Sequence, residues 1–249
     1  MELTNSLLWQ GFAVFLRVSA LVSLLPAFGE RTVPARVKLG LAFAFTMAIT
    51  PAVSPPAMAP QFDSIVWFIL TEITAGILLG IGLRLFVLAL QTAGSIAAQS
   101  TSLAQVLGGA MAEPVPAMGH ILVMGGLALA LMGGLHVRVA EMVILSYDML
   151  PMGRLPSGAD VSEWGVDQIR RAFSLAFTLA APFVVLSVLY NVALGVINKA
   201  MPQLMVAFVG APVITAGGLL LLCLAAPILL ATWLDALNTF IQNPLNSVP

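Results

Sequence analysis

Charged residues are scarce in this 249-residue chain: they make up 8% of the sequence, whereas hydrophobic residues make up 60%. A soluble domain averages about 25% charged residues, so the composition excludes an ordinary water-soluble protein. The net charge of -1 gives no electrostatic support for a nucleic-acid partner. A single cysteine, Cys223, excludes a disulfide within the chain, and its apolar surroundings predict a small buried side chain.

The sequence also lacks the motifs of common catalytic and cofactor chemistry. No glycine-rich loop followed by Lys-Ser/Thr is present, so nothing indicates a P-loop ATPase. His120 and His136 are too far apart to form one helical pair of metal ligands, and no cysteine or acidic cluster accompanies them. No Ser/His/Asp set or carboxylate pair has a setting suited to catalysis. We therefore expect no catalytic residue, no metal, no cofactor and no enzyme activity.

What the sequence does contain is a series of long uncharged stretches. No Asp, Glu, Lys or Arg occurs in residues 39–62, 85–112, 114–137, 172–198 or 200–234. A charge near the centre of a bilayer costs roughly 2.5–3.5 kcal/mol, so a membrane selects for such stretches. The pattern predicts an all-α, polytopic membrane protein with one membrane-embedded domain and no independent soluble domain.

About six hydrophobic helical segments follow from this pattern. They cover residues 7–28, 39–59, 64–90, 118–146, 172–197 and 204–234. Prolines end the helix of the second segment early, because a proline lacks a backbone donor and clashes with the preceding turn. That segment is therefore short for a span, which needs about 20 residues.

The remaining regions are more polar or contain helix breakers. Residues 91–118 predict a polar helix followed by a Gly/Pro-rich loop, and residues 148–171 predict a hydrophilic connector. Pro212 and Pro227 leave the last segment as either one strongly tilted helix or two shorter ones. The first residues carry no Lys or Arg, so we expect the first segment to stay rather than be cleaved as a signal.

The distribution of basic residues gives conflicting indications of topology. Lys and Arg cluster in residues 31–38, which places that connector in the cytoplasm by the positive-inside rule. Six full spans would then place Arg154, Arg170 and Arg171 outside, against the same rule. The conflict indicates that some segments do not span the membrane fully.

Arg17, Glu72 and Arg84 lie within otherwise apolar stretches. Glu72 and Arg84 lie twelve residues apart, which places them about 120° out of phase on a helix. They cannot touch each other, so each needs its own partner. Two interpretations stay open: Arg84 extends to a membrane interface and Arg17 lies near a helix end, or these charges mark a polar path or a subunit contact.

Polar and small residues also recur at helical spacing. Gln91, Ser95, Gln99 and Ser102 form one polar stripe, which suits either hydrogen bonding between helices or the lining of a water-filled path. The pair Gly76 and Gly80 is typical of close helix packing. A similar four-residue spacing joins Ser187, Asn191 and Gly195.

A set of short motifs, in order along the chain, resembles the flagellar biosynthetic protein FliR family, which includes the corresponding subunit of virulence type III secretion systems. The matching stretches are residues 15–20, 26–29, 34–39, 91–95 with Gln99, 133–136, 146–153, 181–182, 191–195 and 201–204. They cover essentially the whole chain. Each motif alone is weak, and their order, spacing and matching length carry the resemblance.

The resemblance implies a subunit of the flagellar type III protein export gate in the bacterial inner membrane, at the flagellar basal body. It implies assembly with FliP- and FliQ-type subunits and cooperation with FlhB- and FlhA-type components. Unfolded rod, hook and filament proteins would pass through the shared channel, and the other contacts would be with membrane lipid. A family member's helical hairpins need not span a flat bilayer.

The resemblance also suggests roles for individual residues. The family's channel plug corresponds to Val106, Leu107, Gly108, Gly109, Ala110, Met111 and Met118. Small and deformable apolar side chains suit a seal that must move aside for a polypeptide. Subunit contacts are expected at Arg17, Asn191, Pro202, Gln203 and Phe208.

Two alternatives stay open at the level of sequence. The first is the virulence secretion subunit of the same family, which sequence pattern does not separate from the flagellar one. The second is a small-solute secondary transporter, which would have two related halves with broken helices around charged midplane residues. Proline-broken segments are present here, but no repeat is evident in the sequence.

Overall fold

A computed structural model describes residues 2–30, 33–54, 64–101, 117–201 and 206–245 of the chain. All of the regular elements in these ranges are helical, which confirms the predicted all-α fold class. The elements are α1 (Glu2–Leu24), α2 (Ala35–Ile49), the 3-10 turn η1 (Thr50–Ala52), α3 (Ile65–Ser100), α4 (Ala117–Met132), α5 (Leu135–Met149), α6 (Gly158–Ala200) and α7 (Val206–Gln242).

Length and composition make this a multi-pass membrane protein. Within the described residues, α1, α3, α6 and α7 are each long and apolar enough to cross a bilayer. The pair α4 and α5 adds a fifth span if it counts as one, and it is bent by 73°. Gly134 lies at this bend with a positive φ of 78°, a conformation that glycine adopts without steric cost. The short α2 has 15 residues and falls below the length of a usual span.

Several helices extend beyond the predicted segments. Helix α3 continues to Ser100, so the polar stretch after residue 90 prolongs the same helix. Helix α6 begins at Gly158, inside the predicted connector, because Ser157 caps it by accepting a hydrogen bond of 3.2 Å from the Asp160 amide. The last segment could have been one helix or two shorter ones. In the structure it is one helix, α7, which contains both Pro212 and Pro227. Polar side chains alone do not end a helix, and membrane helices tolerate proline.

The contacts divide the chain into two compact units, and α3, α4, α6 and α7 each contribute residues to both. Unit 1 comprises Met1–Phe86, Ala130–Ile169 and Ala236–Pro249, and unit 2 comprises Val87–Leu129 and Arg170–Asp235. Each unit is described by itself below.

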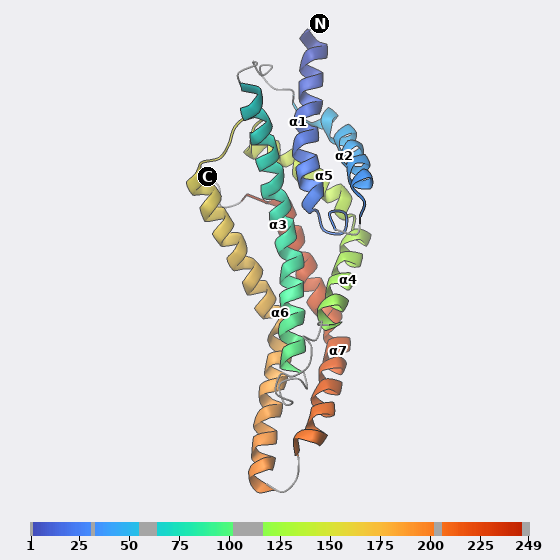
Figure 1. Ribbon diagram of the computed structural model, residues 1–249, viewed down its shortest axis with the longest axis vertical. Helices are drawn as coiled ribbons and strands as arrows, with labels where there is room; N and C mark the ends of the chain where they lie inside the picture. Colours follow the sequence, from blue (N-terminus) through green and yellow to red (C-terminus); the bar gives the residue numbers. More distant parts are fainter. Residues whose placement is uncertain (1, 31–32, 55–63, 102–116, 202–205, 246–249) are drawn as a thin grey trace. The chain divides into compact units, whose positions relative to one another are not determined.

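In unit 1, α1 and α3 run in the same direction and approach closely (Figure 1). A Cβ on Gly76 would lie 2.9 Å from the Ala20 Cβ, and one on Gly80 would lie 2.9 Å from the Leu24 Cβ. Real Cβ atoms do not approach so closely, so only glycine fits at these two positions. The packing role predicted for Gly76 and Gly80 is confirmed.

Helix α2 runs antiparallel to α1 (Figure 1). Because the chain turns back along α2, the long helices α1 and α3 can run in the same direction. The rings of Phe15 and Phe43 stack with centroids 4.7 Å apart. Near the other end of α2, the buried amide of Gln10 donates hydrogen bonds to the carbonyls of Thr50 and Val53, with the first at 2.7 Å. These bonds satisfy backbone acceptors that the end of a helix leaves free.

The last residues of the described chain also belong to the core of unit 1. Phe240 is buried against Gly82, and its ring lies 5.4 Å from that of Phe86. The indole of the buried Trp164 donates a 2.8 Å hydrogen bond to the Pro244 carbonyl. The end of α7 and the residues after it are therefore held by both apolar packing and a buried hydrogen bond.

The predicted burial of Cys223 is wrong. Cys223 is exposed on α7. The same helix also exposes several large apolar side chains, namely Val213, Leu219, Leu220, Leu224 and Ile228. In a membrane protein an apolar stretch can face lipid or another subunit, so the apolar surroundings of a cysteine do not imply burial within its own chain.

Replacing Gly76 by alanine tests the close approach of α1 and α3. The new methyl group would collide with α1, so we expect a lower thermal unfolding temperature in detergent and less accumulated protein. Gly11→Ala is the matched control, because a Cβ there meets nothing within 4 Å. Alanine is favoured over glycine in a helix by about 1 kcal/mol, so the control should be neutral or stabilising. Equal stability of the two variants would contradict the close approach.

Candidate functional site

The most distinctive polar feature of unit 1 is a completely buried ion pair between α1 and α3. The Nε atom of Arg17 lies 2.9 Å from Oε2 of Glu72, and the two side chains are 1% and 0% exposed. A buried charge without a partner costs several kcal/mol, so each of these residues requires the other. The expectation that Glu72 and Arg84 each need a separate partner is confirmed, since Arg84 pairs with Glu30.

The remaining donors of Arg17 are directed at α5 and at the turn after it. Nη1 donates a 2.9 Å hydrogen bond to the Ser146 hydroxyl, which itself donates to the Val143 carbonyl at 2.6 Å. Nη2 donates to the Leu150 carbonyl at 2.9 Å. A planar guanidinium presents its donors in a fixed fork, so these bonds fix α5 relative to α1.

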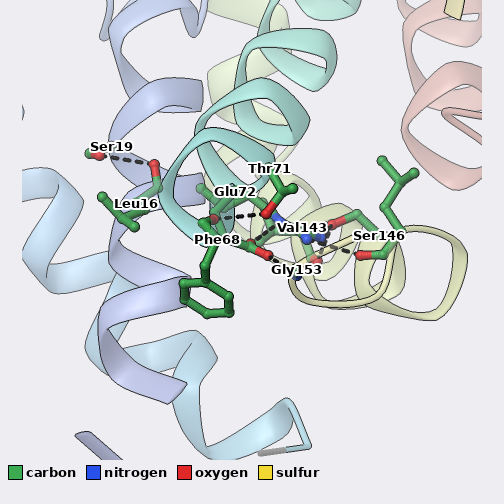
Figure 2. A network of polar contacts seen from close by, with 10 residues as sticks. Leu16, Ser19, Phe68, Thr71, Glu72, Val143, Ser146 and Gly153 are labelled. Atoms are coloured by element: carbon green, nitrogen blue, oxygen red, sulfur yellow. Dashed lines mark hydrogen bonds and ion pairs between the residues drawn. The ribbon is translucent and has the colours of Figure 1, made fainter. Parts of the chain in front are cut away.

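Glu72 holds the same turn from its other side. The Gly153 amide donates a 3.2 Å hydrogen bond to Oε1 of Glu72. Figure 2 shows Glu72, Ser146 and Gly153 converging between the helices. The φ of Gly153 is 75°, which favours glycine at this turn. We call the set Arg17, Glu72, Ser146, Leu150 and Gly153 the clasp, because its ion pair contacts the turn at both residue 150 and residue 153.

Aromatic rings enclose the clasp. The guanidinium carbon of Arg17 lies 3.6 Å from the centroid of the Tyr147 ring, which is a cation–π geometry. Phe68, one turn before Glu72, is buried and packs edge-on against Trp9, with ring centroids 6.3 Å apart. The apolar enclosure strengthens the ion pair by excluding water. It also makes the loss of either charge costly.

The second ion pair differs in exposure. The side chains of Arg84 and Glu30 are 31% and 34% exposed, and the pair joins α3 to the connector after α1. In the same connector, the Lys38 ammonium donates a 2.8 Å hydrogen bond to the Gly29 carbonyl. Half-exposed pairs of this kind contribute about 0–1 kcal/mol. Both interpretations of Arg84 stay predictions.

The predicted polar stripe lies at the C-terminal end of α3. Gln91 and Gln99 are exposed, Ser95 is half-buried, and Ser102 lies outside the described residues. Next to the stripe, Ala93, Gly94 and Ala97 are buried and form the packed face of the helix in unit 2. The exposed position of the glutamines leaves both interpretations of the stripe as predictions.

Most of the predicted plug lies outside the described residues: Val106, Leu107, Gly108, Gly109, Ala110 and Met111. Met118 is described, and it is buried at the start of α4. Pro202 and Gln203 also lie outside the described residues, and Phe208 belongs to α7 without a described side chain. Their roles stay predictions.

Of the expected subunit contacts, two have described side chains. Arg17 is fully occupied within unit 1. Asn191 is exposed on α6 and donates a 3.3 Å hydrogen bond to the Ser187 hydroxyl one turn earlier. Asn191 therefore remains accessible to a neighbour, whereas Arg17 stabilises its own chain.

Sequence reasoning missed the partners of Arg17 in and after α5. Ser146 and Gly153 lie within a stretch that we used only as a family motif, and the Leu150 carbonyl has no sequence signature. A useful signal was present nonetheless, because two opposite charges in different apolar segments must find partners somewhere. Among the described residues, no cluster of three His, Cys, Asp or Glu side chains could hold a metal ion.

A double-mutant cycle on Arg17 and Glu72 tests the clasp. Glu72→Leu leaves a buried unpaired guanidinium, so we expect a loss of about 3–5 kcal/mol in unfolding free energy. The double variant Arg17→Met, Glu72→Leu should recover part of this loss, because no unpaired charge remains. Thermal unfolding in detergent measures both effects.

Arg84→Met is the matched control, since it breaks the half-exposed ion pair and should cost about 0–1 kcal/mol. If the loss of unfolding free energy in the double variant equalled the sum of the losses in Arg17→Met and Glu72→Leu, the two buried charges would not depend on each other.

Comparison with known proteins relates this arrangement to one family. Residues 8–240 match the family described as bacterial export proteins, family 1. The flagellar biosynthetic protein FliR of Caulobacter vibrioides is 31% identical over 226 residues, which cover 89% of this chain and 90% of that protein.

Two further relatives carry the same name. The protein of Escherichia coli is 32% identical over 244 residues, covering 95% of this chain and 91% of its own length. That of Bacillus subtilis is 24% identical over 238 residues, covering 94% and 92%. The match includes α1, α3, α5 and the turn that the clasp holds, and by its extent the chain belongs to the bacterial export proteins, family 1.

Proposed function

We propose that the chain is a membrane subunit of the flagellar type III protein export gate. The observation that carries this proposal is the match to FliR proteins over about nine-tenths of both chains. The relatives' names are flagellar, which favours this system over a virulence secretion system. In this role the subunit acts as part of a channel for unfolded rod, hook and filament proteins.

The outward surface of unit 2 supports a role within an assembly. Helix α6 exposes Phe177, Val185, Leu189 and Val196, each more than half exposed. An exposed apolar surface of this extent requires lipid or another protein to cover it. FliP- and FliQ-type subunits in the inner membrane are the proposed neighbours, together with FlhB- and FlhA-type components at the basal body. Asn191 lies on this same helix and is a proposed contact.

The transporter alternative receives less support from the buried charges. Both carboxylate oxygens of Glu72 accept hydrogen bonds, one from Arg17 and one from Gly153. Arg84 is held by Glu30 instead of lying opposite Glu72. A coupling-ion site would need carboxylate oxygens directed at the ion, and Glu72 directs its own at protein donors.

Co-expression with partner subunits tests the proposal directly. We expect the tagged chain, purified in detergent with FliP- and FliQ-type proteins of the same organism, to appear in native mass spectrometry as one discrete hetero-oligomer. Its exposed apolar faces should make that complex more abundant than the free chain. A stable monomer or homodimer that never recruits these partners would contradict the export-gate function.

Deletion of residues 106–112 tests the proposed closure of the channel. If this segment plugs the resting channel, the assembled complex that lacks residues 106–112 should conduct ions even when no substrate is present. Reconstitution in a planar bilayer with potassium chloride measures this leak, and the intact complex is the control. A deletion complex that assembles but stays as tight as the intact one would remove the plug role while leaving subunit membership in place.

A further inference from the structure

The last described residues of the chain, 236–245, pack tightly against an earlier helix of unit 1. The ring of Phe240 lies against Gly82 of α3, where an added Cβ would collide with it. Glycine is therefore the one residue at position 82 that admits this ring without displacement. Beyond the end of α7, Leu245 is 3% exposed, so the apolar packing continues past the helix. This end of the chain is thus part of a core.

Two polar contacts join the same residues to other helices of unit 1. Trp164 of α6 is 2% exposed, and its indole nitrogen donates a 2.8 Å hydrogen bond to the Pro244 carbonyl. The indole N–H is the only polar group of a tryptophan side chain, so without this carbonyl a buried donor would lose its acceptor. Arg138 of α5 donates a hydrogen bond to the side-chain oxygen of Asn238. Residues 236–245 therefore contact α3, α5 and α6.

The clasp lies in the same unit but is formed by different residues. All five clasp residues lie between Arg17 and Gly153, and their hydrogen bonds join them to one another. These bonds can therefore form before residue 236 has been added to the chain. A chain is synthesised from its N-terminus at about 5–20 residues per second, so the clasp residues are complete several seconds before residues 236–245.

We infer that residues 236–245 act as a latch, which closes unit 1 after the clasp has formed and only in a chain synthesised to its end. The inference does not depend on the proposed export function, because it concerns how the chain completes its own fold. An incomplete chain can still pair Arg17 with Glu72, but it leaves the Trp164 indole without its acceptor. Such a chain is open at the latch while the clasp is closed, which distinguishes it from a finished one.

Two shortened chains that both end on asparagine test the latch. A chain that ends at Asn243 lacks Pro244 and Leu245, whereas a chain that ends at Asn246 keeps both. The new chain terminus has the same chemistry in each, so the second chain is a matched control for the first. Amide hydrogen exchange, measured by mass spectrometry in detergent, reports how often each region opens.

In the chain ending at Asn243, the loss of a buried hydrogen bond and of apolar packing should make amides 160–169 exchange about tenfold faster or more. Amides 146–153, beside the clasp, should change by less than about twofold, and the chain ending at Asn246 should match the full-length chain in both regions. Equal acceleration in the two regions would overturn the inference, because the chain end and the clasp would then open as one core. Unchanged exchange of amides 160–169, or equal acceleration in both shortened chains, would also overturn it.

A single substitution decides the matter if the chain ending at Asn243 does not accumulate. Trp164→Phe keeps an aromatic ring and removes the indole donor, so we expect amides 236–242 to exchange about threefold to tenfold faster. Trp67→Phe makes the same chemical change on α3, where the tryptophan is 55% exposed, and it should leave that exchange unaltered. Equal exchange of amides 236–242 in these two variants would overturn the inference.

Discussion

Withdrawing a guanidinium from water is unfavourable by several kcal/mol unless its donors find acceptors, and this constraint organises unit 1. Arg17 meets it with acceptors from α3, from α5 and from the turn that follows α5. Each acceptor comes from a different segment of the chain, so the arginine cannot be satisfied until all of them are in place. Glu72 couples to the same turn through Gly153. One buried charge pair thus makes the positions of three helices depend on one another.

The glycines of α3 make this ion pair possible. Gly76 and Gly80 let α1 approach until backbone and side-chain atoms touch, and Glu72 lies one turn before Gly76 on the same helix. At a larger separation the ion pair would lengthen and admit water, which weakens it. The parallel course of α1 and α3 also requires the chain to return between them. Helix α2, which is 15 residues long and runs antiparallel to α1, makes part of that return.

The membrane made much of this fold predictable. Because a bilayer excludes charge, the apolar segments at residues 7–28, 64–90, 172–197 and 204–234 marked the long helices, and the helical phase of Glu72 and Arg84 showed that each needs its own partner. The identity of those partners was not predictable: 55 residues separate Arg17 from Glu72, and backbone acceptors such as the Leu150 carbonyl leave no trace in the sequence. Cys223 shows the opposite failure, since an apolar environment in the sequence can be lipid or a partner instead of the chain's own core.

The helices differ in how much of their apolar surface the chain itself covers, and this difference bears on how the subunit works. Half of the most apolar window of α3 is buried, whereas only 28% of that in α6 and 17% of that in α7 is buried. Lipid can cover such faces, but lipid cannot seal a protein-conducting channel. A channel wall needs protein-to-protein contact along its length. The sparsely covered helices α6 and α7 would therefore offer the surfaces for neighbouring subunits, whereas α3 contributes more of its apolar window to the packing of the chain itself.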